Sequence, residues 1–272
     1  MTILRKLSEI AAKNLPTSSY FTLQEWVRPI LQRDRIRFGR KVSILEDGYR
    51  VTWPDGTVFH FAHAQRYGRY MHKDGLSYIF KFMLDKYQDQ RVAVERGDVV
   101  VEVGTNVGEF ACAIAPVASR VFAFEPDPNA LPSLRRNAAL HDNIEVLPFA
   151  AGATDGEMEF FIQTATSDSS IIEPDKWSQK VVMPTKSLAS VVKEYGIPQI
   201  DFLKVEAEGY EPEVLEGAVD ALQCVRKVSV DCSPERNGEP TFEGCERILH
   251  AHGFETWRRS SDYSMMLFGV RT

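Results

Sequence analysis

The chain has 272 residues, of which 44% are hydrophobic and 11% aromatic, so it can bury one full-sized α/β core with about 90 residues left over. Its 32 basic and 38 acidic residues give a net charge of -6, which excludes a broad cationic surface for a nucleic-acid backbone. No run reaches the roughly 18 uncharged apolar residues of a membrane span, and the N-terminal stretch lacks the apolar segment of a signal peptide. We therefore expect a cytoplasmic protein with no nucleic-acid partner and no membrane span.

Residues 1–94 are predicted to form a small N-terminal α+β extension. Residues 1–38 have a helical pattern, and residues 41–61 contain three short β-type runs separated by Asp-Gly dipeptides at 47–48 and 55–56. These dipeptides favour tight hairpin turns, so the stretch predicts a three-stranded meander. A helix then follows, with apolar positions at Ile79, Phe82, Met83 and Tyr87. The extension either covers an edge of the main sheet or forms part of a substrate pocket, and the pattern leaves both roles open.

From residue 95 to the C-terminus, apolar strands alternate with helices. Strands are predicted at 98–104, 119–126, 143–152, 157–162, 200–209 and 226–235, and helices at 187–195, 211–222 and 242–252, with an irregular segment at 163–180. This alternation predicts a mostly parallel, doubly wound, Rossmann-like sheet with helices on both faces. The last two strands, 254–261 and 263–270, are joined too closely for a crossover and must pair antiparallel. An α/β sheet that ends in this way is typical of class I methyltransferases.

The segment 99–108 (VVVEVGTNVG) is an apolar strand that enters a glycine turn and then a helix. Ligands of open α/β sheets bind beyond the C-terminal ends of such strands, where Gly104 and Gly108 allow the backbone to approach closely. The spacing lacks the G-x-G-x-x-G that holds a dinucleotide pyrophosphate. S-adenosylmethionine carries an ammonium group and no phosphate, so Glu102 before the turn suits it.

A second carboxylate, Glu125, ends the next strand and is followed by Pro126. An acidic residue at this distance from the glycine turn can accept hydrogen bonds from both ribose hydroxyls of a nucleoside cofactor. Two carboxylates at neighbouring strand ends therefore indicate a nucleoside site.

Five stretches in this order and spacing resemble the FkbM family of methyltransferases: 102–108 (EVGTNVG), 123–126 (AFEP), 147–152 (LPFAAG), 200–209 (IDFLKVEAEG) and 213–218 (EVLEGA). The resemblance implies an S-adenosylmethionine-dependent enzyme, typically an O-methyltransferase acting on a hydroxyl of a sugar, glycolipid or natural product. It implies cofactor contacts at Glu102, Val103, Gly104, Thr105, Asn106, Gly108, Glu125, Pro126, Ala150, Ala151 and Glu206. Ser169 and Ser170 match a serine-bearing stretch near the family's active site and are expected to contact the acceptor substrate.

The chain departs from the family at two acidic positions. Glu206 stands where the family usually has Asp in its Lys-x-Asp-x-Glu-Gly element, and Asp231 stands where the following strand often ends in Glu. The charge is kept, but each carboxylate moves by one methylene group. We expect Glu206 to act in the chemistry, and Lys204 to be paired with a carboxylate because an unpaired buried ammonium is costly.

A base would assist transfer to a weakly acidic hydroxyl. The candidates are Glu206, Glu208, Asp231 and a histidine among His60, His63, His72 and His141, and Lys204 is a further candidate for the catalytic cluster. The four cysteines show neither CxxC spacing nor nearby His, so no metal or disulfide framework is expected.

Three other functions remain open on the sequence. The enzyme could methylate nitrogen, it could be an NAD-dependent oxidoreductase that uses Glu125 on the ribose, or it could be a non-catalytic binding module. The missing glycine fingerprint disfavours the oxidoreductase, and the charges kept at Glu102, Glu125 and Glu206 disfavour the non-catalytic module. The oligomeric state and the identity of the acceptor do not follow from the residues.

Overall fold

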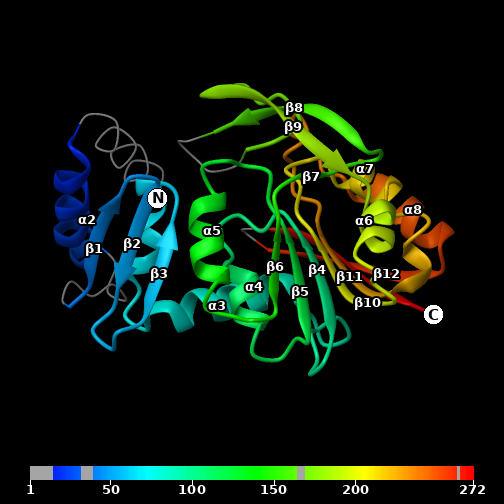
Figure 1. Ribbon diagram of the computed structural model, residues 1–272, viewed down its shortest axis with the longest axis horizontal. Helices are drawn as coiled ribbons and strands as arrows, with labels where there is room; N and C mark the ends of the chain where they lie inside the picture. Colours follow the sequence, from blue (N-terminus) through cyan, green and yellow to red (C-terminus); the bar gives the residue numbers. More distant parts are fainter. Residues whose placement is uncertain (1–14, 32–38, 164–168, 262–263) are drawn as a thin grey trace.

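The computed structural model describes residues 15–31, 39–163, 169–261 and 264–272. Its largest element is a seven-stranded sheet with helices on both faces (Figure 1). A three-stranded sheet built from the N-terminal segment lies beyond the helices of one face, and a second small sheet crosses one end of the large one (Figure 1).

The large sheet has the strand order β12-β13-β11-β10-β4-β5-β6. Its strands are β4 (Val99–Val103), β5 (Arg120–Phe124), β6 (Ile144–Leu147), β10 (Ile200–Val205), β11 (Val225–Asp231), β12 (Phe254–Ser260) and β13 (Met265–Arg271). The pairs β5–β6, β4–β5, β4–β10 and β10–β11 are parallel, whereas β13 pairs antiparallel with both β11 and β12. The predicted fold class, with its antiparallel last strand, is confirmed.

Helices cover both faces because the strand residues alternate between two apolar cores. α3 (Gly75–Tyr87), α4 (Glu109–Ile114) and α5 (Leu131–Ala138) lie on one face, and α6 (Leu188–Glu194), α7 (Glu211–Glu216) and α8 (Phe242–Ala251) lie on the other (Figure 1). Val100 and Phe202 belong to the first core, and their neighbours Val101 and Leu203 belong to the second. All six residues of β10 are buried, as expected of a central parallel strand.

The segment 143–186 differs from the prediction. Residues 143–152 form two short strands in different sheets, because the chain turns at Pro148 after β6 and β7 (Ala150–Ala151) pairs with β9 (Gln179–Lys186). β9 was not predicted, since it is largely exposed and contains Pro184, and it pairs antiparallel with β8 (Gly156–Ile162). β9 is the middle strand of this small sheet, but β7 pairs only with Thr185 and Lys186. Pro184 therefore has a strand neighbour on the β8 side alone, and proline is tolerated where no ladder hydrogen bond is needed from it. The part of the predicted irregular loop at 164–168 lies outside the described residues.

The N-terminal meander is confirmed as β1 (Lys41–Leu45), β2 (Gly48–Thr52) and β3 (Val58–Phe61). Helix α2 (Thr17–Leu31) precedes it, and the short 3-10 helix η1 (Ala64–Met71) links it to α3. The predicted helical residues 1–14 and 32–38 lie outside the described part of the chain. The boundary at residue 94 stays a prediction.

An aromatic core that includes Tyr20, Phe61 and Tyr70 joins the meander to Val107 beside α4. The side-chain amide of Asn137 on α5 donates to the carbonyl oxygens of His60 and Val107, at 2.9 and 2.7 Å. These contacts fix the N-terminal segment against the face of the sheet that α4 and α5 cover.

Among the described residues, no helix has the length and apolar character needed to cross a bilayer. All four cysteines are free thiols, and three of them are buried. Within the same residues, no group of three or more His, Cys, Asp or Glu side chains is arranged to hold a metal ion.

Candidate active site

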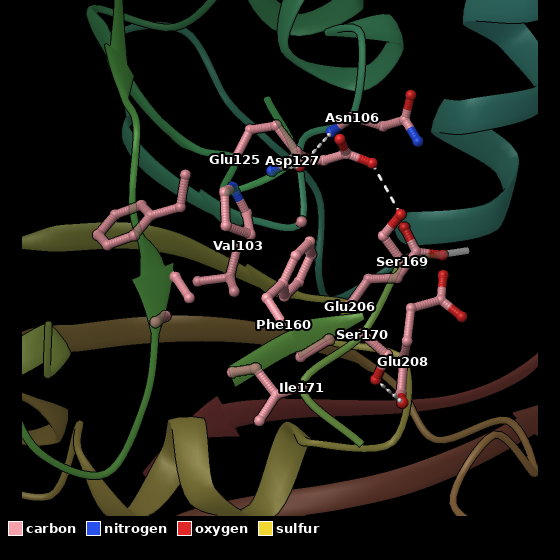
Figure 2. A pocket seen from close by; sticks show the side chains of 16 residues that line it. Val103, Asn106, Glu125, Asp127, Phe160, Ser169, Ser170, Ile171, Glu206 and Glu208 are labelled. Atoms are coloured by element: carbon pink, nitrogen blue, oxygen red, sulfur yellow. Dashed lines mark hydrogen bonds between the residues drawn. The ribbon is translucent and has the colours of Figure 1, made fainter. Parts of the chain in front are cut away.

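A first cavity opens at the C-terminal ends of β4, β5 and β10 (Figure 2). Eight of the residues predicted to bind the cofactor line it, namely Val103, Gly104, Asn106, Glu125, Pro126, Ala150, Ala151 and Glu206. The strands bring these residues together although they come from four separate stretches of sequence. Of the other predicted contacts, Glu102 and Thr105 line a neighbouring cavity, and Gly108 is in the wall of neither.

The glycine turn is built by close contacts within the chain. Gly104 has φ +76°, and a Cβ atom on it would lie 1.9 Å from the carbonyl oxygen of Glu206. The backbone amide of Gly104 donates to the carbonyl oxygen of Phe124 at 3.1 Å, and that of Glu206 donates to Val103 at 3.1 Å. Glycine is therefore required at position 104 by the approach of β10 itself, before any ligand is considered.

Glycine at position 108 also has a structural reason. Its φ is +91°, and a Cβ atom there would lie 2.9 Å from Cδ1 of Leu134 on α5. The second glycine of the motif thus lets α4 begin close against α5 and does not face a cavity.

Glu125 is a buried carboxylate held by two backbone amides (Figure 2). The amide of Asn106 donates to Oε2 at 2.6 Å, and the amide of Asp127 donates to Oε1 at 2.8 Å. Burial, reinforced by the nearby charge of Asp127, raises the pKa of Glu125 to about 8. Each carboxylate oxygen has a second lone-pair direction, so both can still accept from a ligand.

The two predicted serines close the first cavity on another side. The hydroxyl of Ser169 donates to Oδ2 of Asp127 at 2.7 Å, and the hydroxyl of Ser170 donates to the carbonyl oxygen of Glu208 at 3.0 Å (Figure 2). The segment that follows β8 is thereby fastened to the ends of β5 and β10. Both serines lie at the wall that encloses Glu125, and neither lines the neighbouring cavity.

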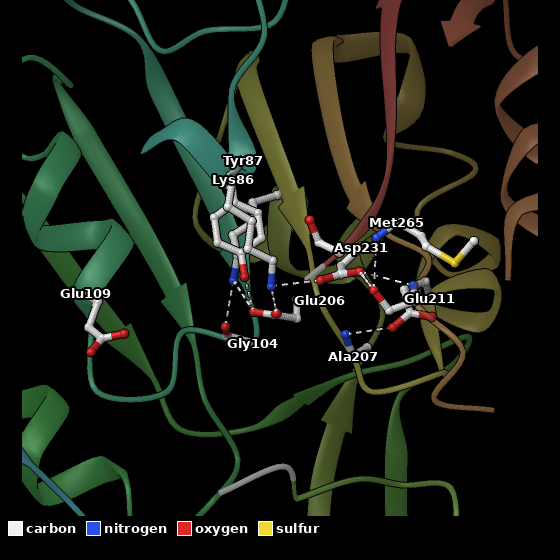
Figure 3. Close-up of polar contacts among 12 residues, drawn as sticks. Lys86, Tyr87, Gly104, Glu109, Glu206, Ala207, Glu211, Asp231 and Met265 are labelled. Carbon is white, nitrogen blue, oxygen red and sulfur yellow. Dashed lines mark hydrogen bonds and ion pairs between the residues drawn. The ribbon is translucent and has the colours of Figure 1, made fainter. Parts of the chain in front are cut away.

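Glu206 is the centre of an ionic network with two lysines and a tyrosine (Figure 3). Lys86 Nζ lies 2.6 Å from its Oε1, Lys204 Nζ lies 3.2 Å from its Oε2, and the hydroxyl of Tyr87 donates to Oε2 at 2.5 Å. Burial opposes the ionisation of Glu206, but the two ammonium groups outweigh it and hold its pKa well below the usual range. Glu206 is therefore ionised at neutral pH and is a weak proton acceptor.

Lys204 is paired, as predicted. Its Nζ lies 3.2 Å from Oε1 of Glu102 and donates to the carbonyl oxygen of Gly104 at 2.7 Å. The second oxygen of Glu102 is buried and has no hydrogen-bond partner within the described ranges. Burial raises the pKa of Glu102 to about 7, although the charge of Lys204 favours its ionised form.

Asp231 lies behind this network and lines neither cavity. Its Oδ2 is 2.8 Å from Nζ of Lys86, and its Oδ1 accepts the backbone amide of Ser233 at 3.0 Å. Asp231 is thus a buried counterion of Lys86, and it does not face the space where a substrate would react.

The turn after β10 is held by a residue that the sequence did not single out. Glu211 is fully buried, and its Oε1 accepts the backbone amides of Ala207 and Gly209, both at 2.9 Å. Glu208 between them has a positive φ of 50° and lines both cavities. Glu211 therefore fixes the strained turn that carries Glu208.

A second cavity shares Gly104, Asn106, Glu206 and Glu208 with the first and continues toward the N-terminal segment. Its other lining residues come from the ends of β3, β4 and β10, from η1, α3 and the start of α4, and from Glu235. The sequence left open whether the N-terminal extension covers a sheet edge or forms part of a substrate pocket. The second role is favoured, because η1 and α3 line a cavity beside the predicted cofactor site.

The four histidines named as candidates for a base lie in different surroundings. His63 lines the second cavity, whereas His60 is beside Asn137 and His72 stacks on Tyr78 with 3.6 Å between ring centroids. Burial lowers the pKa of both His60 and His141. Of these four histidines, only His63 lines the first or the second cavity.

Sequence reasoning missed Lys86, Tyr87, Glu211 and Glu235. The first two were part of a predicted helix but carried no motif, and their contacts with Glu206 span 120 and 119 residues of sequence. Glu235 follows Asp231 in the segment 231–236 (DCSPER), and its proximity to that carboxylate was the available signal.

Comparison with known proteins agrees with this geometry. Residues 102–257 match the Methyltransferase FkbM domain family. The hexuronic acid methyltransferase AglP of Haloferax volcanii is 31% identical over 140 residues, which cover 50% of this chain and 56% of that protein. The 2-O-methyltransferase NoeI of Sinorhizobium fredii is 24% identical over 156 residues, which cover 50% of this chain and 64% of that protein.

Among solved structures, the FkbM methyltransferase of Methylobacillus flagellatus is 15% identical with a TM-score of 0.46, over 71% of this chain and 58% of that one. The family match begins at Glu102, beside the glycine turn, and ends in β12. The matched region thus includes the strands β5, β10 and β11 and the cavity-lining residues at their C-terminal ends. This chain belongs to the FkbM family of methyltransferases.

Proposed function

We propose that this protein transfers the methyl group of S-adenosylmethionine to a hydroxyl of a sugar, glycolipid or natural product. The observation that supports this most directly is the buried Glu125, which lies in a cavity at the strand ends beside a glycine turn without a phosphate-binding fingerprint. The related proteins named as a hexuronic acid methyltransferase and a 2-O-methyltransferase support an oxygen acceptor on a sugar.

The residues of the first cavity fit this cofactor. Glu125 has two carboxylate oxygens available for two ribose hydroxyls. Ala150, Ala151 and Phe160 give the wall an apolar part that suits a purine ring. Glu206 contributes a permanent negative charge, which complements a cofactor that carries an ammonium and a sulfonium group.

When bound, the cofactor supplies an electrophilic methyl group. The residues of the chain then have to hold it, exclude water and place the acceptor oxygen in line, and positioning alone supplies several kcal/mol of such a barrier. We assign Glu206 to orientation of the cofactor, because its two lysine partners make it a weak base. Lys204, Lys86 and Asp231 act as positioning residues through Glu206.

We assign proton removal to Glu208, with Glu235 beside it. Oε2 of Glu235 is buried and lacks a hydrogen-bond partner in the described ranges, and the side chain lines the second cavity. Burial and the nearby carboxylates of Glu208 and Asp231 raise its pKa far above the usual range. With so high a pKa Glu235 is protonated at neutral pH, so it would donate a hydrogen bond to the acceptor oxygen. Glu208, which lines both cavities, would accept the proton that the acceptor hydroxyl loses as its oxygen forms the new bond to the methyl carbon.

Binding and turnover assays together test this function. Calorimetry with S-adenosylhomocysteine should give a Kd in the micromolar range or below, and NAD should not bind. Incubation with radiolabelled S-adenosylmethionine and a panel of hydroxylated and amine acceptors should label hydroxylated compounds. Label on amines alone would replace the O-methyltransferase proposal with N-methylation, and binding of NAD in place of S-adenosylhomocysteine would overturn it.

A further inference from the structure

The second cavity lies between the N-terminal segment and the cofactor site. Arg69 on η1 and Lys86 on α3 line one side of it, and Glu102 and Gly104 at the end of β4 line the other. Because it shares Glu206 with the first cavity, a group bound in one can reach a group bound in the other.

The charges in this wall nearly balance. Four lysine and arginine side chains and five glutamates line it. Glu109 is fixed by Arg69 and accepts the hydroxyl of Tyr70 at 2.8 Å, and the network around Glu206 is paired as well. Burial raises the pKa of Glu102 to about 7 and that of Glu235 further, so the glutamates that remain ionised do not outnumber the four cations. Such a wall offers many hydrogen-bonding groups but no strong field for a phosphate or a polyamine.

One aromatic side chain is exposed in this polar wall. Phe82 on α3 is 37% exposed and lines the cavity, whereas Ile79 and Met83 on the same helix are 1% and 6% exposed. An exposed aromatic ring can stack on the apolar face of a ligand, while the polar side chains around it form hydrogen bonds with the ligand's hydroxyl groups. A pyranose ring has both features, since its C–H face is apolar and its edge carries hydroxyl groups.

We propose that the second cavity is the acceptor site and that it binds a neutral pyranose ring stacked on Phe82. The N-terminal segment is then the part of the chain that recognises the acceptor, and the ring edge faces the carboxylates near Gly104. This inference rests on the proposed function, because it needs a methyl donor in the first cavity.

Saturation-transfer NMR of the full chain with saturating S-adenosylhomocysteine tests it. Methyl β-D-glucopyranoside should receive saturation at its ring C–H protons. Phe82→Ala should weaken that binding about three- to tenfold, the range for one aromatic contact, whereas Phe82→Trp should retain it. Leu140→Ala is the matched control, because Leu140 is an exposed apolar residue outside both cavities.

The outcomes separate this inference from the proposed function. The wild type, both Phe82 variants and Leu140→Ala should bind S-adenosylhomocysteine with equal affinity. If the wild type does not bind S-adenosylhomocysteine, the proposed function fails. With S-adenosylhomocysteine bound, no glycoside signal, or equal signals in wild type and Phe82→Ala, would overturn the acceptor site. Binding of methyl β-D-glucuronide without the glucopyranoside would overturn the neutral-ring assignment.

Discussion

Replacing Glu206 by Gln keeps the size of the side chain and removes its charge. The change weakens two ion pairs, with Lys86 at 2.6 Å and Lys204 at 3.2 Å, and the hydrogen bond from Tyr87. Loss of a partner from a buried pair costs about 3–5 kcal/mol when the remaining charge is left alone. Here Lys86 keeps Asp231 at 2.8 Å and Lys204 keeps Glu102 at 3.2 Å. We therefore expect a smaller loss of unfolding free energy, about 2–3 kcal/mol, which is close to the contribution of one charge-assisted hydrogen bond.

That loss corresponds to a Tm lower by roughly 4–12 °C in a chain of this size. The sequence alone suggested that Glu206 acts in the chemistry more than in folding, and the ion pairs add a structural role. Urea denaturation of wild type, Glu206→Gln, Lys86→Met and the double variant measures it, and a coupling energy of about 1–2 kcal/mol is expected. Additive effects, or a Glu206→Gln variant as stable as the wild type, would refute the network.

The stability that Glu206 contributes depends on pH in a defined direction. Its pKa is lowered in the folded protein, so the contribution is complete at pH values above its unfolded pKa of about 4.3. It is lost as the pH falls from there toward the folded pKa. The difference in unfolding free energy between wild type and Glu206→Gln should therefore be constant from pH 6 to 8 and shrink below about pH 4. A difference that grows on acidification would contradict the assignment.

Three further experiments test other parts of the site. The pKa of Glu125 is raised to about 8, and its ionised form should hold the ribose. Affinity for S-adenosylhomocysteine should therefore rise by up to tenfold per pH unit between pH 6 and 8. Calorimetry of Glu125→Gln should show no such pH dependence, and a flat wild-type profile would contradict the assignment. Gly104→Ala should destabilise by about 2–4 kcal/mol in urea, whereas Gly97→Ala, with φ +90° and open space around its Cβ, should cost only the backbone strain of about 1–2 kcal/mol. Glu208→Gln should lower kcat about 100-fold or more with a smaller effect on cofactor affinity, and normal turnover would move proton removal to His63.

The first cavity was largely predictable because its signals are local. A strand, a glycine turn and a helix follow one another within 99–108, and Glu125 ends the next strand. Parallel strands bring their C-terminal ends to one edge, so the topology alone places these residues together. The reason for Gly104 was not predictable, since the atom that excludes a side chain belongs to Glu206.

The second cavity was not predictable because its walls meet only in the folded chain. Lys86 and Tyr87 occupy helix positions of an amphipathic segment, and nothing in their sequence neighbourhood indicates that they reach Glu206, the residue that follows β10. Glu109 likewise meets Arg69 and Tyr70 across 40 and 39 residues. Such pairs depend on how α3 and η1 pack against the sheet, and that packing follows from apolar contacts with no spacing rule in the sequence.

The two departures from the family pattern, Glu206 and Asp231, are structurally linked because both carboxylates contact Lys86. The longer Glu206 and the shorter Asp231 both bind its ammonium group, at 2.6 and 2.8 Å, so the methylene gained at one position matches the methylene lost at the other. Glu206→Asp alone should withdraw a carboxylate from Lys86, and Asp231→Glu alone should force an extra methylene into a site that is 2% exposed; each should cost about 1–3 kcal/mol. The double exchange restores the family's usual pair, so it should recover at least half of the summed loss in urea denaturation. Strictly additive losses would mean that the two positions changed independently.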